Sequence, residues 1–150
     1  SRPDCRSVTR YLLDTNILSD ATKPKPSPQI AAWLQEQDDN DLFISTLTLA
    51  EIRKGILEKD AGRKRRELEH WFSGPDGPRA QFHRRILPFD EASAIEWARI
   101  MAEGTSSGRP RSALDMIIAA TAAAHDCTVV TLNERHFQSV VACLNPANPD

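Results

Sequence analysis

Long hydrophobic runs are absent from the 150-residue chain, and so are the marks of export and of disulfide bonding. The longest apolar stretch, residues 116–125, is too short and too rich in alanine to span a bilayer. The first ten residues are polar and lack the apolar core of a secretory signal. The three cysteines, Cys5, Cys127 and Cys143, are odd in number and show no C-x-x-C spacing, which argues against a disulfide framework and a zinc site. These absences predict a protein of the reducing cytoplasm with no membrane partner.

Two further absences concern nucleotides and nucleic acids. The chain has no G-x-G-x-x-G and no Walker sequence, which excludes the standard nucleotide cradles. The net charge is -2, so no positive field covers the whole molecule. Local basic clusters do stand at residues 62–67, 83–85 and 108–111. Each cluster is either a solvated surface or a patch for phosphate groups.

What the chain does contain is an ordinary globular composition, with 40% hydrophobic and 27% charged residues. Its length predicts a single domain over residues 1–150, with a core from about residue 10 to 145. Short apolar segments alternate with segments of helical periodicity. The predicted strands are residues 10–13, 41–45, 85–89, 128–132 and 140–144, and the predicted helices are 28–37, 48–60, 63–72, 90–104 and 112–126, with a helical turn at 134–140. This alternation predicts an α/β fold with a mostly parallel sheet covered on both faces.

Two of the predicted helices have distinct burial patterns. Residues 112–126 are apolar nearly all round, which predicts a buried helix. Residues 90–104 are amphipathic, and their spacing predicts an inward face. That face consists of Ala94, Ile95, Ala98 and Met101.

Acidic and amide side chains stand just after predicted strands or in first helical turns. Asp14 and Asn133 each follow a strand, whereas Glu51 and Asp115 lie in first turns. In a parallel sheet all four reach the edge formed by the carboxyl ends of the strands. Each one also has a capping explanation, because Asp14 and Asn133 are good N-caps and because Thr48 with Glu51, and Ser112 with Asp115, match capping boxes.

Capping alone gives no reason for several carboxylates to converge. A hard divalent cation needs several oxygen ligands in one place, and Mg²⁺ takes only a few carboxylates, which leaves positions for phosphate oxygens. No histidine or cysteine stands among these acids, so zinc is disfavoured. The convergence therefore favours a site for a divalent cation over a set of unrelated caps.

Four segments resemble, in order, the motifs of the PIN-domain ribonucleases, in particular the VapC-like toxins of type II toxin–antitoxin pairs. The segments are LLDTNILSD (12–20), STLTLAEIRKGI (45–56), SALDMIIAATA (112–122) and TVVTLNERHF (128–137). The resemblance runs from about Tyr11 to Phe137. It implies a PIN-like three-layer α/β/α fold and a metal-dependent endoribonuclease, in which metal-activated water hydrolyses an RNA phosphodiester and leaves a 5′-phosphate and a 3′-hydroxyl.

The resemblance also implies roles for single residues. Asp14, Glu51 and Asp115 match the acids that hold Mg²⁺ or Mn²⁺, and Asn133 stands at a fourth catalytic position where many relatives have an aspartate. Thr15, Asn16 and Thr131 match polar residues that support the site. Four cations close in sequence to the acids are candidates for contacts with RNA phosphates, with surface solubility as the alternative. These cations are Arg53, Lys54, Arg109 and Arg111.

The partners implied are an RNA substrate, a cognate antitoxin and a second copy of the chain in a homodimer. We expect the antitoxin to place an Arg or Lys among the carboxylates, since a guanidinium matches a carboxylate bidentately. Two alternatives stand beside the nuclease: a catalytically degenerate PIN-like binding module, and a haloacid-dehalogenase-like phosphatase. The phosphatase family requires a second aspartate where this chain has Asn16. Hydrolysis of DNA is also compatible with the chemistry, because metal-assisted attack does not select the sugar.

Overall fold

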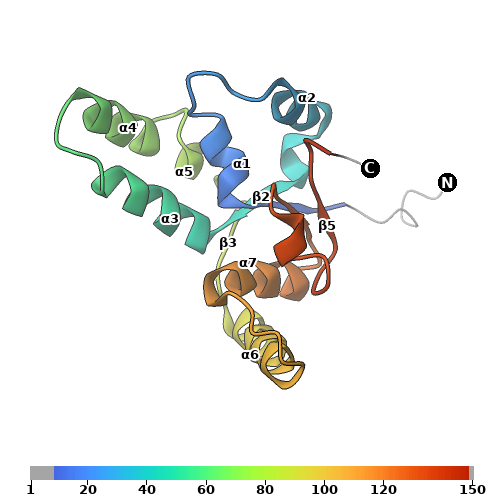
Figure 1. Cartoon of the computed structure of the whole chain (residues 1–150). Coiled ribbons are helices and arrows are strands. Elements are labelled where there is room, and N and C mark those ends of the chain that lie inside the picture. Colours follow the sequence, from blue (N-terminus) through green and yellow to red (C-terminus); the bar gives the residue numbers. More distant parts are fainter. Residues whose placement is uncertain (1–8, 149–150) are drawn as a thin grey trace.

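A computed structural model describes residues 9–148 and shows a parallel sheet between two layers of helices (Figure 1). Its strand order is β3-β2-β1-β4-β5, and every neighbouring pair is parallel. The strands are β1 (Tyr11–Leu13), β2 (Leu42–Ser45), β3 (Ile86–Leu87), β4 (Thr128–Val130) and β5 (Cys143–Leu144). The predicted α/β architecture with a parallel sheet is confirmed. Cys5 and the polar amino terminus lie outside the described residues.

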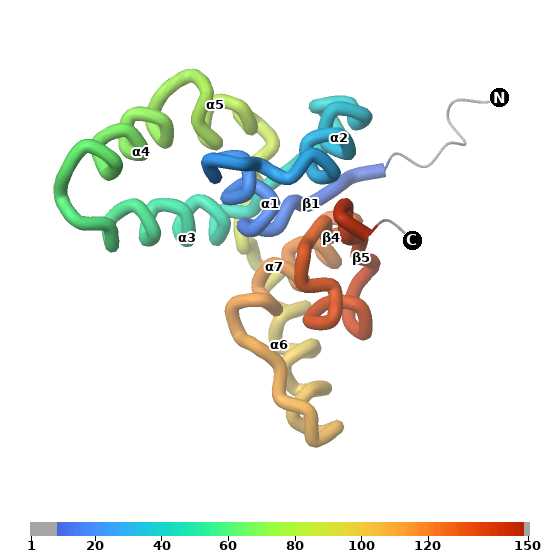
Figure 2. The backbone as a smooth tube through the Cα atoms, turned by 45° about the horizontal axis from the view of Figure 1, so that its top comes forward, coloured from blue at the N-terminus to red at the C-terminus, as the bar shows by residue number. Residues whose placement is uncertain are grey.

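Seven α-helices and two short 3-10 helices connect these strands in the described part of the chain. They are α1 (Thr15–Asp20), α2 (Pro28–Glu36), η2 (Asp39–Asp41), α3 (Thr46–Leu57), α4 (Arg63–Ser73), α5 (Pro78–Gln81), α6 (Glu91–Ser106), α7 (Ala113–Ala124) and η3 (Glu134–His136). Figure 2 shows α3 and α4 side by side, reaching away from the sheet. None of the helices within residues 9–148 has the length and apolar character that a bilayer crossing requires.

The sheet buries a separate apolar core on each face. On one face Leu12, Ile100 and Phe137 pack with the apolar side of α7. On the other face Leu13 and Ile17 pack with residues from β2, β4 and α2. Leu12 and Leu13 are consecutive in β1 and point to opposite faces, as the two-residue period of a strand requires. The result is the three-layer α/β/α arrangement that the resemblance implied.

The prediction for the inward face of α6 is wrong in part. Ala94 and Met101 are half-buried, but Ala98 is exposed and Ile95 is 67% exposed. Alanine and small residues occur all round this helix, so hydrophobicity alone does not fix its rotation. The Asp90 carboxylate fixes the first turn, because it accepts hydrogen bonds from both the amide and the hydroxyl of Ser93. The helix consequently buries three other positions: Ser93, Ile100 and Gly104.

Candidate active site

Asp14 lies at the junction of β1 and α1 and is almost fully buried. One carboxylate oxygen accepts the amide of Thr15 at 2.8 Å, which makes Asp14 the N-cap of α1. The other oxygen accepts the hydroxyl of Thr131 at 2.8 Å. Burial is the main cause that raises the pKa of Asp14, the carboxylates of Asp115 and Glu51 add to it, and the two hydrogen bonds oppose it. Asp14 is therefore both the N-cap of α1 and a carboxyl group whose charged form is destabilised, mainly by burial.

The Glu51 carboxylate accepts a hydrogen bond from one end of a chain of hydroxyl groups. The Thr15 hydroxyl donates to Glu51 Oε1 at 2.5 Å and lies 3.1 Å from the hydroxyl oxygen of Thr48. Because a hydroxyl carries one proton, and Thr15 uses its own on Glu51, Thr48 supplies the proton between the two threonines. Ser45 Oγ lies 3.3 Å from Thr48 Oγ1 and continues the chain. The chain therefore runs from β2 through α3 and α1 to the carboxylate.

The same contacts correct the predicted capping box of Thr48 and Glu51. Helix α3 begins at Thr46, and its N-cap is Ser45, whose hydroxyl oxygen accepts the amide of Thr48 at 3.1 Å. Ser45 is the last residue of β2, so the helix begins at Thr46, two residues before the predicted start at residue 48. Thr48 is completely buried. Its hydroxyl is left to serve Thr15 and Glu51 instead of the helix end.

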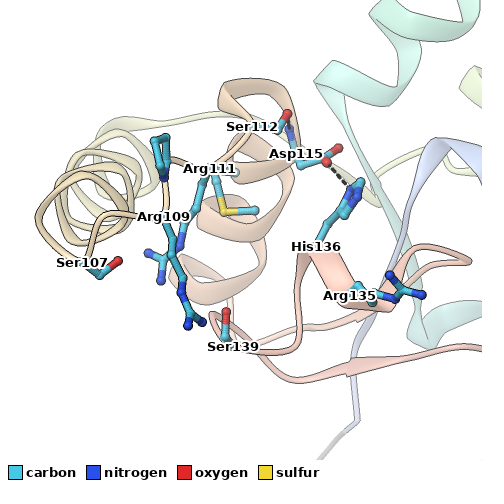
Figure 3. A pocket seen from close by; sticks show the side chains of 10 residues that line it. Ser107, Arg109, Arg111, Ser112, Asp115, Arg135, His136 and Ser139 are labelled. Carbon is cyan, nitrogen blue, oxygen red and sulfur yellow. Dashed lines mark hydrogen bonds and ion pairs between the residues drawn. The ribbon is translucent and has the colours of Figure 1, made fainter.

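Asp115 stands in the first turn of α7 and faces η3. The predicted cap at Ser112 is confirmed, because the Ser112 hydroxyl oxygen accepts the amide of Asp115 at 3.3 Å. The Asp115 carboxylate does not return the bond to Ser112 and instead lies 2.7 Å from His136 Nδ1 (Figure 3). His136 was missed from the sequence because a helical turn at residues 134–140 does not show which side chain points back toward α7.

The residues that follow β4 form hydrogen bonds with Asp14 and with the start of α1. Thr131 Oγ1 accepts the amide of Asn133 at 3.0 Å while its proton goes to Asp14. Asn16 accepts the amide of Leu132 at 3.3 Å, so it ties the start of α1 to this segment. The exposed Asn133 occupies the N-cap position of η3, but its side chain makes no capping bond. Thr15, Asn16 and Thr131 thus lie around Asp14, and Asn133 lies at the rim.

The donor set fits a hard divalent cation in its chemistry. Asp14, Glu51 and Asp115 offer only oxygen atoms, which Mg²⁺ and Mn²⁺ prefer. Burial is the main cause of the raised pKa of Asp14, and the Asp115 and Glu51 carboxylates add to it, so a nearby cation would favour the charged form. Each acid has its own protein partner, and no three acidic, histidine or cysteine side chains within residues 9–148 are close enough to share an ion. Binding an ion among them requires their side chains to turn toward one point.

The four predicted RNA-binding cations have different surroundings. Arg53 lies 3.2 Å from Glu69, and Lys54 lies 2.6 Å from Glu58, so both are paired on the surface of α3 and α4. Arg109 and Arg111 instead line a pocket of about 730 Å³ beside Asp115 (Figure 3). Its other polar lining includes Arg135, His136 and Ser139, which sequence reasoning did not single out.

Comparison with known proteins gives consistent matches over most of the chain. A family model described as PIN domain matches residues 11–142. Toxin FitB of Neisseria gonorrhoeae is 37% identical over 136 residues, which are 90% of this chain and 96% of that protein. VapC ribonuclease Y4jK of Sinorhizobium fredii is 33% identical, over 92% of this chain and 98% of that protein. The crystal structure of FitAcB from Neisseria gonorrhoeae superposes with a TM-score of 0.86 at 35% identity, covering 92% and 99% of the two chains.

Proposed function

The chain belongs to the PIN-domain family, and on this premise we propose that it is a metal-dependent endoribonuclease and the toxin of a toxin–antitoxin pair. The names of its relatives, a toxin and a VapC ribonuclease, support both parts of the proposal. One structural observation carries it. Three carboxylates from three separate elements reach one edge of the sheet, and the buried one has its pKa raised by burial and by the other two.

We assign Asp14, Glu51 and Asp115 as ligands of Mg²⁺ or Mn²⁺, with Asn133 as a fourth catalytic position at the rim. The bound ion supplies an activated water and neutralises charge on the phosphodiester. The chain itself orients the ligands: Thr131 and the Thr15 amide hold Asp14, and the Thr15 hydroxyl holds Glu51. No side-chain nucleophile is required: water attacks the phosphorus, the bond to the 3′-oxygen breaks and that oxygen takes up a proton, so the products are a 5′-phosphate and a 3′-hydroxyl.

The proposal includes a protein partner and a compartment. A toxin requires a cognate antitoxin, and the carboxylates offer it a site for an Arg or Lys side chain, which pairs with them in place of metal. The thiols of Cys127 and Cys143 have no disulfide partner within residues 9–148. Free thiols of this kind support a reducing compartment, and we place the protein in the cytoplasm, where RNA is also present.

Replacing Asp14 with asparagine tests the nuclease most directly. Asp14→Asn should slow the cleavage of labelled RNA by about 100-fold or more, because metal assistance contributes several kcal/mol to the transition state. The exposed Asp60→Asn is the matched control and should cleave like the parent. Chelator should stop the parent enzyme, and Mg²⁺ or Mn²⁺ should restore it.

Each result of this experiment has a definite meaning. Cleavage by Asp14→Asn at the parent's rate contradicts the assignment of Asp14. A parent protein that binds RNA but cleaves none with either ion identifies a degenerate PIN-like binding module. Equal cleavage of RNA and DNA of the same sequence replaces the ribonuclease with a nuclease that does not select the sugar.

A further inference from the structure

A pocket lies between the α6–α7 connection and η3, next to Asp115 (Figure 3). We call it the Arg109 pocket; its ionisable residues are Arg109, Arg111, Arg135, His136 and Asp115. The single carboxylate already has His136 beside it at 2.7 Å. The remaining groups are cationic, so the pocket attracts an anion although the chain as a whole has a net charge of -2.

Arg111 supports the wall of the pocket through contacts with α6. Its guanidinium donates to the carbonyl oxygen of Ile100 at 2.6 Å and lies 3.8 Å from Glu103, and only 21% of the side chain is exposed. Gly104 provides the space for it, since a Cβ at this position would lie 3.1 Å from the Arg111 side chain. Arg111 is therefore held by the protein and has little freedom to follow a ligand.

Arg109 has the opposite character. Its amide donates to the carbonyl oxygen of Gly104 at 2.9 Å, and the preceding Gly108 turns the chain with a φ of +75°. The backbone is thus fixed, while the side chain is exposed and makes no ion pair within residues 9–148. In Figure 3 it extends along the pocket toward Ser139 on the opposite wall. A cation presented from a fixed backbone loses less freedom when it binds an anion.

The rest of the pocket suits a nucleotide better than a bare phosphate. Pro110 and Met116 give it an apolar wall, and Ser107 and Ser139 give it hydroxyl groups at the rim. Its volume of about 730 Å³ falls within the range of roughly 300–1,000 Å³ that is usual for small-ligand pockets. Asp115, a proposed metal ligand, belongs to the same lining, so whatever fills the pocket lies beside the reacting bond.

We propose that the Arg109 pocket holds one nucleotide of the RNA next to the scissile phosphodiester, with Arg109 as the ligand of that nucleotide's phosphate. This assignment rests on the proposed ribonuclease function. A guanidinium binds a phosphate through two parallel hydrogen bonds. Arg109 thus acts in substrate binding, whereas Arg111, two residues further along the chain, maintains the shape of the pocket.

The test measures binding without cleavage. A fluorescent single-stranded oligoribonucleotide is titrated with protein in chelator, and its anisotropy gives the dissociation constant at several salt concentrations. Arg109→Ala should raise this constant about tenfold and should reduce the slope of its logarithm against the logarithm of salt by about 0.7, the value for one phosphate contact on a single strand. The matched control is Arg79→Ala, which removes an exposed arginine of α5 and should change neither quantity.

A second variant approaches the pocket from its other wall. Ser139→Asp places a carboxylate opposite Arg109 and should weaken RNA binding at least as much as Arg109→Ala does. If Arg109→Ala and Arg79→Ala bind RNA equally, or if Ser139→Asp leaves the dissociation constant unchanged, the nucleotide site is not in this pocket. Cleavage by the parent protein with Mg²⁺ or Mn²⁺ decides the nuclease function separately, so the failure of one proposal is distinguishable from the failure of the other.

Discussion

At the scale of single residues, Asp14 combines roles that conflict in energy. It caps α1, accepts the hydroxyl of Thr131, and lies near two other carboxylates while almost fully buried. A buried charge destabilises a protein unless hydrogen bonds or an opposite charge compensate it. The two hydrogen bonds compensate only in part, as the raised pKa shows. Asp14 therefore lowers the stability of the fold when it is charged, which is the cost expected of a residue proposed to bind a cation.

This conflict predicts how stability depends on pH when metal is removed. The folded protein keeps the Asp14 proton above the ordinary pKa of 3.8, so stability falls as pH rises from that value through the raised pKa. Asp14→Asn has no such ionisation. In chelator, the parent should lose more unfolding free energy than Asp14→Asn between about pH 4 and pH 7. Urea unfolding of both proteins measures the difference, and parallel pH profiles would contradict the prediction.

Thr48 is the second residue whose role can be tested alone. Thr48→Val keeps the shape but removes the proton that Thr48 gives to Thr15, which leaves Glu51 less firmly held. We expect a higher Mg²⁺ concentration for half-maximal cleavage, and a loss of about 1–3 kcal/mol of stability because Ser45 also loses its partner. Thr48→Ser should restore the Mg²⁺ dependence. If Thr48→Val lowers only the melting temperature, Thr48 is a packing residue and does not position Glu51.

At the scale of elements, the sequence predicts every strand and every long helix, because alternating segments and apolar periodicity are local properties. It does not reveal α1, since the polar run Asp14–Asn16 hides a helix of only six residues. The predicted buried face of α6 is wrong in part, because the buried Ser93 is held by a side-chain contact with Asp90 and not by hydrophobicity.

The candidate site, too, is predictable from local sequence only in part. The proximity of Asp14, Glu51 and Asp115 is predictable, because each follows a strand or opens a helix and a parallel sheet brings such positions to one edge. Their role as metal ligands stays a prediction. The partners of these acids are not predictable. Asp115 and His136 are 21 positions apart in the sequence. Thr15 is 33 positions from Thr48 and 36 from Glu51. Only the packed structure brings these residues together.

Two glycines in helices give an element-scale prediction. A Cβ on Gly55 in α3 would meet nothing within 4 Å, so Gly55→Ala should stabilise the protein by about 1 kcal/mol and raise the melting temperature by roughly 2–4 °C. A Cβ on Gly104 in α6 would lie 3.1 Å from both the Arg109 carbonyl oxygen and the Arg111 side chain. Gly104→Ala should therefore melt below the parent, and equal gains from both substitutions would show that the contacts between Arg111 and α6 are loose.

At the scale of the whole molecule, the resemblance to VapC-like toxins predicts a homodimer. Large apolar side chains remain exposed on the single chain, among them Ile95 at 67% and Leu114 at 53%. Exposed apolar residues of this size are compatible with a surface that a partner covers. Light scattering at micromolar concentration should give twice the 16.7 kDa of one chain. A mass of one chain at that concentration would contradict the dimer.

The bonds that hold Asp14 also set when the enzyme can first act during its synthesis. The Asp14 amide donates to the Val130 carbonyl oxygen, and its carboxylate accepts from Thr131, 117 residues later in the chain. A ribosome-bound chain that ends before β4 contains Asp14 and Glu51 but has no strand to fix the first of them. A messenger truncated upstream of that point should therefore yield a harmless fragment. The site around Asp14 therefore cannot form until Thr131, 117 residues further along the chain, has been synthesised.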